Sequence, residues 1–401
     1  MENKLPEGWK ITNLEYICNL VTDGTHDKTP LVDKEIGVPL VTSKDLTEDG
    51  ISFENVTYIT TEQHQQIIRR SKPEKGDILY SKIGTIGKPT IVNVDFEFSI
   101  KNVALFKLKE DIVFNKYIRY YLKCEQVHNS LLKRADGGNQ KFIPINALKK
   151  IEIILPPLKT QQKIVSILEK AEETRKLRAQ ADELTQKLLQ SVFLEIFGDP
   201  VTNPMGWNTE KLEKLCVKIY GGGTPSKSKP EYYEGDIPWV TPKDMKQDFI
   251  QDSIDHISEK AIEESSTKLI PPYSLLMVIR SGILKHTLPI AINNCKVTMN
   301  QDMKGFVFDD KLTNSFFMLY YFKIYQRDLL NRVRSVTADN LEFSQIKDID
   351  VILPPIKQQQ RFTTIVEQLD RTRSNQQQSS LEINSLFDAL MQKAFTGKLV
   401  S

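Results

Sequence analysis

Three patterns in the sequence could carry chemistry, and each lacks a residue or a spacing that its chemistry requires. Ile270-Pro271-Pro272-Tyr273 has the shape of an amino-methyltransferase motif, but isoleucine stands where a polar side chain must hold the target amine. The run Gly-Thr-Ile-Gly-Lys-Pro at 84–89 is spaced too tightly for a phosphate-binding loop, and proline replaces the hydroxyl residue that would hold magnesium. The five histidines show no zinc-binding spacing. We therefore expect no catalytic residue and no metal site on this chain.

Composition limits the classes of protein that remain. At ~150 residues per domain, 401 residues correspond to two or three folded units, and a hydrophobic content of 40% is enough to bury their cores. The formal net charge is only +2, so a nucleic-acid partner would have to meet local basic surfaces. The start of the chain lacks a secretory signal, no apolar run approaches the ~20 residues of a membrane span, and the four cysteines form no close pair. These features predict a cytoplasmic protein that does not enter a membrane.

The elements that would position a site follow from an internal repeat. Gly8-Trp9 recurs as Gly206-Trp207, and Leu155-Pro156-Pro157 recurs as Leu353-Pro354-Pro355, in both cases 198 residues later. Between these anchors, segment 39–45 matches segment 238–244 after one inserted residue. A period this long exceeds that of a solenoid repeat. The sequence therefore predicts two copies of one module, each followed by a long helix.

Each module is predicted to be α+β. In the first, alternating apolar residues indicate strands within 90–108, and helical spacing covers 61–70 and 114–134. In the second, helices are expected at 258–266 and 313–332. The predicted boundaries are 1–157 for the first module, 158–198 for the first long helix, 199–355 for the second module and 356–401 for the second long helix.

The two long helices are predicted from apolar residues that return every three or four positions. The pattern is weaker in the second helix, whose middle from 374 to 380 is polar, while Gly198 and Pro200 end the first. A narrow apolar stripe on a helix of roughly 57 Å favours a partner helix. We expect an antiparallel coiled coil that relates the modules by a pseudo-twofold axis. The alternative is that each helix packs only on its own module.

With these features, the chain resembles a known family, the specificity subunits of Type I restriction-modification enzymes. The resemblance rests on Leu5-Pro-Glu-Gly-Trp9, on Gly223-Thr-Pro-Ser226 with Gly235-Asp-Ile-Pro-Trp-Val240, and on the run from Leu155 to Val165 with its later partner. Ile196-Phe-Gly-Asp-Pro200 closes the first long helix as it does in that family. Thr160 and Gln358 depart from the usual glutamate of the Pro-Pro-x-x-Glu-Gln pattern, which puts a subunit contact by that acid in doubt.

The resemblance implies two target-recognition domains, each of which reads half of a bipartite site in double-stranded DNA. The long helices would set the gap between the halves and dock two modification (methyltransferase) subunits, and two restriction subunits would complete the complex. S-adenosylmethionine, ATP and magnesium would belong to those partners, so this chain would hold no cofactor. Two other classes stay open on the residues alone, a stand-alone DNA enzyme with an unrecognised centre and a structural scaffold.

Candidate DNA-binding residues are polar or basic side chains in loop-like stretches, many of them beside glycines, because amides and guanidinium groups read base edges and lysines contact phosphates. They are Thr25, His26, Lys44, Lys82, Lys88, Lys101, Asn102, Asn139, Gln140 and Lys141 in the first module, and Thr224, Lys227, Lys243, Arg280, Lys285, His286, Asn300 and Gln301 in the second. Lys44 is predicted to correspond to Lys243 and Lys82 to Arg280. Arg280 is the strongest candidate because it directly follows an apolar strand-like run.

Four glutamines near the helix starts are candidates for the interface with the modification subunits, namely Gln161, Gln162, Gln359 and Gln360. They are expected on the exposed sides of the helices.

Overall fold

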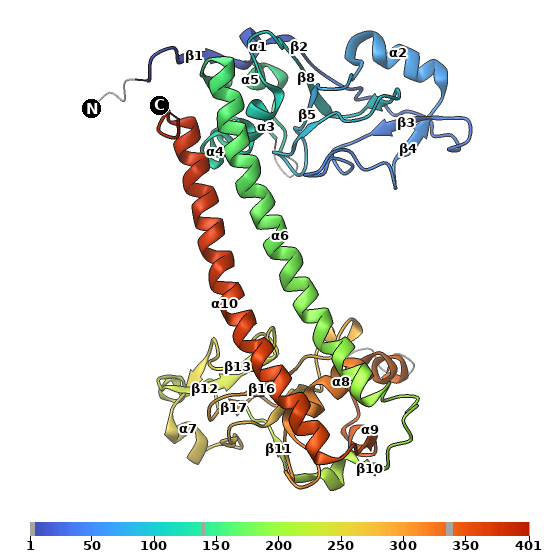
Figure 1. Cartoon of the computed structure of the whole chain (residues 1–401), viewed down its shortest axis with the longest axis vertical. Coiled ribbons are helices and arrows are strands. Elements are labelled where there is room, and N and C mark those ends of the chain that lie inside the picture. The colour runs from blue at the N-terminus through green and yellow to red at the C-terminus, as the bar shows by residue number, and fades with distance from the viewer. Residues whose placement is uncertain (1–4, 138–140, 334–339, 401) are drawn as a thin grey trace. The chain divides into compact units, whose positions relative to one another are not determined.

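The computed structural model describes residues 5–137, 141–333 and 340–400. The chain forms two compact units (Figure 1). Unit 1 comprises residues 1–178 together with 379–401, and unit 2 comprises residues 179–378. Each long helix therefore contributes one half to each unit.

Unit 1 is built from short strands and helices joined by tight turns. Its strands are β1 (Lys10–Asn13), β2 (Cys18–Asp23), β3 (Val38–Val41), β4 (Thr57–Ile59), β5 (Ile78–Ser81), β6 (Pro89–Ile91), β7 (Ser99–Ile100), β8 (Val103–Leu108) and β9 (Glu152–Leu155). Its helices are α1 (Leu14–Ile17), α2 (Thr61–Ser71), α3 (Asn115–Lys123), α4 (Glu125–Lys133), α5 (Ile145–Lys149) and the start of α6 (Leu158–Phe197).

Two sheets of unit 1 pack face to face. One has the order β2-β8-β5-β6 and the other the order β4-β3-β7. Strand β5 contributes to two hydrophobic cores. Ile78 and Tyr80 face the core under α3, while Leu79 faces the core shared with the smaller sheet. Because both faces are covered, the strand is apolar at successive positions instead of alternating.

Unit 2 repeats this arrangement. Its strands are β10 (Thr209–Lys211), β11 (Cys216–Gly221), β12 (Ile237–Val240), β13 (Phe249–Ile250), β14 (His256–Ile257), β15 (Leu275–Val278), β16 (Ile290–Asn293), β17 (Thr298–Met299), β18 (Met303–Phe308) and β19 (Asp350–Ile352). Its helices are η1 (Leu212–Leu215), η2 (Pro230–Tyr233), α7 (Glu259–Glu263), η3 (Gly282–Lys285), α8 (Ser315–Val333), α9 (Phe343–Lys347) and the start of α10 (Ile356–Phe395).

The sheets of unit 2 have the orders β11-β18-β15-β16-β13 and β14-β12-β17, so they match those of unit 1 apart from the added edge strand β13. In both units a separate two-stranded sheet, β1-β9 or β10-β19, leads into a long helix. The predicted duplicated α+β fold is confirmed.

The predicted helices differ in detail from those observed. Segment 114–134 is two helices, because the backbone of Cys124 is extended and ends α3 before α4 begins. Segment 258–266 forms only the short helix α7. The first long helix ends at Phe197, and Gly198 follows in the left-handed conformation with φ +76°. In the residues that the structure describes, no helix is long and apolar enough to span a membrane.

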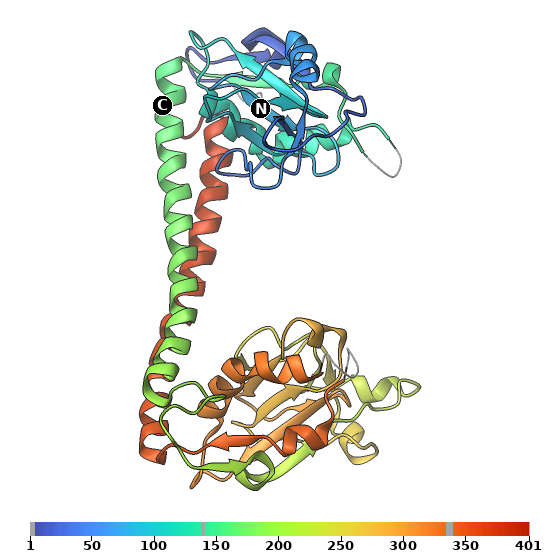
Figure 2. The same cartoon turned by 90° about the vertical axis from the view of Figure 1, so that its right-hand side faces the viewer.

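The two long helices pair within each unit, the start of one beside the end of the other, so they run antiparallel (Figures 1 and 2). In unit 1, Phe395 near the end of α10 packs edge-on against Tyr117 and Tyr121 of α3, with ring centroids 5.5 and 5.1 Å apart. In unit 2, Phe193 and Phe197 near the end of α6 pack against Phe317 of α8. The module core therefore extends onto both helices.

Candidate nucleic-acid interface

Four loops of unit 1 meet at one end of its sheets. The backbone N–H of Asn102 donates to the carbonyl of Thr25 at 3.1 Å, and that of Lys101 donates to Val41 at 2.9 Å. These bonds join the loops that follow β2, β3 and β7. The carbonyl of Lys82, after β5, accepts from Ile143 at 2.8 Å, which brings the segment before α5 to the same corner. The predicted residues Thr25, Lys82, Lys101 and Asn102 are thus brought together.

The matching loops of unit 2 meet in the same way. Gly223 donates to Met299 at 2.8 Å, Asn300 donates to Val240 at 3.0 Å, and Leu341 donates to Ile279 at 2.8 Å. We call this meeting point of loops in each unit the loop corner. It comprises the loops after β2, β3, β5 and β7 in unit 1 and those after β11, β12, β15 and β17 in unit 2.

One turn of the loop corner is built identically in both units. Asp45 accepts hydrogen bonds from the backbone N–H and the hydroxyl of Thr42 at 2.7 and 2.8 Å. Asp244 accepts the same two bonds from Thr241 at 2.8 and 2.9 Å. Lys44 and Lys243 each precede the aspartate and are exposed. Their predicted correspondence is confirmed, and each presents a cation from a turn fixed by its own side chains.

A second equivalence joins side chains across the loop corner. His26 Nδ1 lies 2.6 Å from Asn102 Oδ1 in unit 1. At the matching place in unit 2, the hydroxyl of Thr224 donates to Gln301 Oε1. Asn102 adopts a left-handed backbone with φ 58°, a conformation that asparagine tolerates better than most residues. The pair in unit 1 links the loop after β2 to the turn after β7, and the pair in unit 2 links the loop after β11 to the turn after β17.

Asp23 is the charged centre of the corner in unit 1. Its carboxylate is buried and pairs with Lys82 Nζ at 2.5 Å, with His26 Nε2 at 2.8 Å and with Arg70. Burial raises the pKa of Asp23, but the hydrogen bonds and charges of Lys82 and His26 outweigh it and hold the pKa below its usual range. The carboxylate therefore stays ionised and orients three basic side chains.

The predicted match of Lys82 with Arg280 is wrong by one residue. Lys82 and Ile279 occupy the same place, because their carbonyls accept the equivalent bonds from Ile143 and Leu341. Successive side chains of an extended strand point to opposite faces, so the shift reverses their exposure. The side chain of Lys82 is 6% exposed and that of Arg280 is 55% exposed. Lys82 orients Asp23 and is removed from the predicted DNA-contacting surface.

Arg280 is held by a carboxylate at the corner of unit 2. Its Nε donates to Asp302 Oδ1 at 2.6 Å, and Nη2 lies 2.6 Å from the same oxygen. Asn300 is buried and donates from Nδ2 to Asp302 Oδ2 at 3.0 Å. Asn300 therefore fixes the turn and orients Asp302, while Arg280 faces solvent.

The remaining DNA-binding candidates that the structure describes are exposed. They are Lys88 and Lys141 in unit 1 and Lys227 in unit 2, all outside helices and strands, together with Lys285 at the end of η3 and His286 directly after it. Asn139 and Gln140 lie outside the described residues.

Gln161 and Gln359 do not lie on an exposed helix face. Gln161 is fully buried, accepts from the backbone of Phe114 at 2.8 Å, and donates to the carbonyls of Ile112 and Pro156, both at 2.9 Å. Gln359 likewise donates to Leu312 and Pro354. These side chains satisfy backbone groups inside the module and cannot contact another subunit, so their predicted role is wrong. Gln162 and Gln360, one residue on, are exposed.

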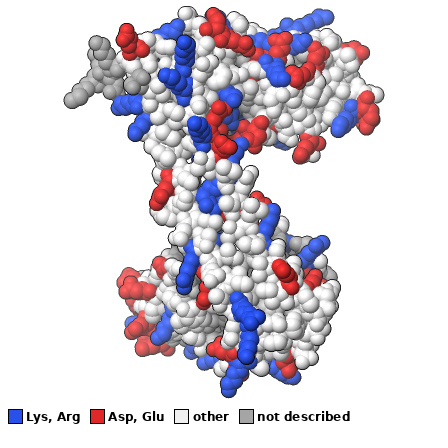
Figure 3. Space-filling view, in the orientation of Figure 1, with Lys and Arg blue, Asp and Glu red and all other residues white. Residues whose placement is uncertain are grey.

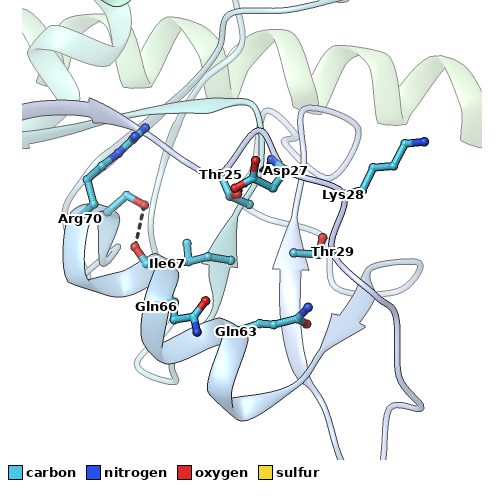
Figure 4. A pocket seen from close by; sticks show the side chains of 9 residues that line it. Thr25, Asp27, Lys28, Thr29, Gln63, Gln66, Ile67 and Arg70 are labelled. Carbon is cyan, nitrogen blue, oxygen red and sulfur yellow. Dashed lines mark hydrogen bonds between the residues drawn. The ribbon is translucent and has the colours of Figure 1, made fainter.

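Arg70, the last cation of α2, is a residue of the loop corner that is not among the candidates predicted from the sequence. Its Nη2 donates to the carboxylate of Asp23 and to the Asp23 carbonyl at 3.0 Å, which ties α2 to the loop corner. A cavity of about 340 Å³ opens beside it, lined from α2 and from the loop after β2 (Figure 4). The available signal was the spacing of Gln63, Gln66 and Arg70, which places three polar side chains on one face of a helix.

The surface charge is mixed. On the face drawn in Figure 3, basic and acidic side chains are interspersed over each unit, which agrees with the small net charge. Among the described residues, no cluster of three or more His, Cys, Asp or Glu side chains could hold a metal ion.

Comparisons with known proteins identify the family. A family model described as "Type I restriction modification DNA specificity domain" matches the chain twice, at residues 6–186 and 204–385. The chain is 32% identical to the specificity subunit of the Escherichia coli type I restriction enzyme EcoR124I/EcoR124II, over 69% of each chain. It is 23% identical to the MjaIX specificity subunit of Methanocaldococcus jannaschii, covering 99% of this chain and 94% of the relative.

Two solved structures share the fold. A chain from a study of complex assembly and conformational transition of the type I R-M system has a TM-score of 0.63 at 20% identity, covering 99% of this chain and all of that one. The S subunit from M. genitalium has a TM-score of 0.59 at 15% identity, covering 98% and 97%. The chain therefore belongs to the family of type I restriction-modification DNA specificity subunits and carries two tandem target-recognition domains.

Proposed function

We propose that each recognition domain reads one half of a bipartite DNA target through its loop corner. Domain 1 and domain 2 here denote the globular parts of units 1 and 2. The observation that carries the proposal is the repetition of one corner in both domains, with an exposed lysine on the same turn and polar pairs at the same place. Lys44 and Lys243 would contact phosphates, and Arg280 would contact a base edge.

The chain itself would be non-catalytic and would carry no cofactor. S-adenosylmethionine would act on a modification subunit, and ATP and magnesium on a restriction subunit, with two copies of each subunit in the complex. The long helices would fix the number of unread base pairs and dock the modification subunits. Gln162 and Gln360 remain candidates for that contact because both are exposed near the helix starts.

Methylation mapping by long-read sequencing tests the proposal. Cells expressing this chain with its modification subunit should gain a bipartite adenine-methylated motif that cells lacking the chain do not show. Arg280→Ala should relax one base position in one half of that motif and leave the other half unchanged. A soluble complex that methylates no motif would overturn the proposed function and favour a scaffold or a stand-alone enzyme.

A further inference from the structure

Helix α2 presents its polar face beside the loop corner of domain 1. Gln63 and Gln66 lie one turn apart, and Arg70 follows one turn after Gln66, so the three share a face of the helix. All three line the cavity of about 340 Å³, with the loop after β2 opposite them (Figure 4). Amide and guanidinium groups on one helix face, next to the loop corner, have the chemistry that reads base edges in a major groove.

Arg70 is oriented and still accessible. Its hydrogen bonds to the described residues all use Nη2, which contacts the carboxylate of Asp23 and the carbonyls of Asp23 and Gly24. Its side chain is 61% exposed, and its Nε and Nη1 groups have no partner among the described residues. With Nη2 held, the two N–H groups of Nη1 stay available in a fixed direction, whereas Nε–H lies on the Nη2 side of the guanidinium.

Neutralising Asp23 does not require Arg70. Lys82 already lies 2.5 Å from that carboxylate and is itself buried, and His26 lies 2.8 Å from it. The ion pair therefore does more to position the arginine than to stabilise the aspartate. Domain 2 holds Arg280 by Asp302 in the same manner, although the arginine comes from a loop instead of a helix.

We propose that Arg70 reads a guanine in domain 1, donating from Nη1 to its O6 or N7 acceptor, with α2 lying against the major groove. The inference rests on the proposed function. Gln66 extends the contact along the same helix face, and the cavity admits the edge of the neighbouring base pair. The two domains would then read guanine through carboxylate-held arginines that stand on different elements.

The test uses the full chain with its modification subunit and compares Arg70→Ala and Arg70→Lys with the wild type. Arg69→Ala is the matched control, because Arg69 is an exposed arginine at the preceding position of the same helix. Arg70→Ala should reduce discrimination at one G·C pair roughly 10- to 150-fold, the range expected for a hydrogen bond from a charged donor. Arg70→Lys should also lose it, because the single nitrogen of lysine cannot both pair with Asp23 and donate to the base. Arg69→Ala should keep the motif.

Motifs identical to wild type in both Arg70 variants would overturn the inference, as would a change in the same half-site that Arg280→Ala alters. If methylation is lost at every site, competition binding by the purified complex with base-substituted duplexes distinguishes a base-reading role of Arg70 from a structural one. Loss of preference at a single G·C pair supports the reading role, whereas a uniform loss with a lowered melting temperature assigns Arg70 a structural role and overturns it. A wild type without any bipartite motif would instead refute the proposed function.

Discussion

Asp248→Asn should destabilise unit 2 far more than the matched change destabilises unit 1. Asp248 lies in the loop before β13 and pairs with Lys323 of α8 at 2.5 Å and with Arg373 of α10 at 3.0 Å. The side chains of Asp248, Lys323 and Arg373 are only 14, 16 and 25% exposed. The amide would leave Lys323 largely buried without its counter-charge and Arg373 with only the charge of Asp370 nearby. Breaking a buried pair costs about 3–5 kcal/mol, and the remaining charge and partial exposure of Arg373 place the expected loss at ~3 kcal/mol.

Asp49 is the matched control, because it follows the same turn in unit 1. Its partner is Lys176 of α6, but the two side chains are 76 and 50% exposed. An exposed pair is screened by solvent and contributes little, so Asp49→Asn should leave the unfolding free energy nearly unchanged.

Urea unfolding of the full chain measures both effects. The fluorescence of Trp207 and Trp239 reports on unit 2 in a Trp9→Phe background, and Trp9 reports on unit 1 when the other two are replaced by phenylalanine. The ~3 kcal/mol loss should also lower the melting temperature of unit 2 by about 6–12 °C. Equal losses in Asp248→Asn and Asp49→Asn would refute the argument that burial of the ion cluster decides its contribution.

Three further predictions use urea unfolding for Gln161 and Asp248 and methylation mapping for Gly222. Gln161→Ala leaves one buried and two part-buried backbone groups without their side-chain partner and should cost about 3 kcal/mol, whereas Gln162→Ala should unfold like the wild type. Gly222→Ala should disrupt the corner of domain 2 and its half-site reading, because a Cβ there would lie 1.7 Å from the carbonyl oxygen of Asn300; Gly282→Ala, which meets nothing within 4 Å, should keep the motif. Burial raises the pKa of Asp248, but Lys323 and Arg373 lower it below its ordinary value, so its contribution is present above about pH 4 and is lost as the pH falls through the depressed pKa. Unfolding free energies at decreasing pH should therefore fall less steeply in Asp248→Asn, and an unchanged slope would contradict this assignment.

Much of the architecture follows from the sequence because duplication leaves a visible trace. The 198-residue repeat and the long helical patterns predict two α+β modules and two long helices, and the matched turns of Lys44 and Lys243 follow from identical spacing of threonine, lysine and aspartate. The position of a residue within a strand cannot be predicted in this way, because backbone pairing with distant segments sets it. The equivalence of Lys82 and Ile279 depends on bonds to Ile143 and Leu341, which local spacing does not encode.

The direction of a side chain also cannot be predicted from the sequence where the residue type is suited both to solvent and to the interior. A glutamine at a helix start is equally acceptable in solvent and as a buried partner for backbone groups. Gln161 is buried because the carbonyls of Ile112 and Pro156 need donors there, while Gln162 points outward. The helix that carries Arg70 was predicted, but its ion pair with Asp23 spans 47 residues and appears only once the sheets are assembled.

The division of each long helix between the units has a consequence for synthesis on the ribosome. Residues 379–401 belong to unit 1, and Phe387, Met391, Ala394 and Phe395 fill its core beside Tyr117 and Tyr121. The first module therefore emerges with an uncovered apolar surface that stays open until some 200 further residues are made, about 10–40 s at usual elongation rates. During that interval the nascent chain exposes apolar surface of the kind that favours aggregation, and a chain that ends before α10 lacks the residues that cover the core of its first module.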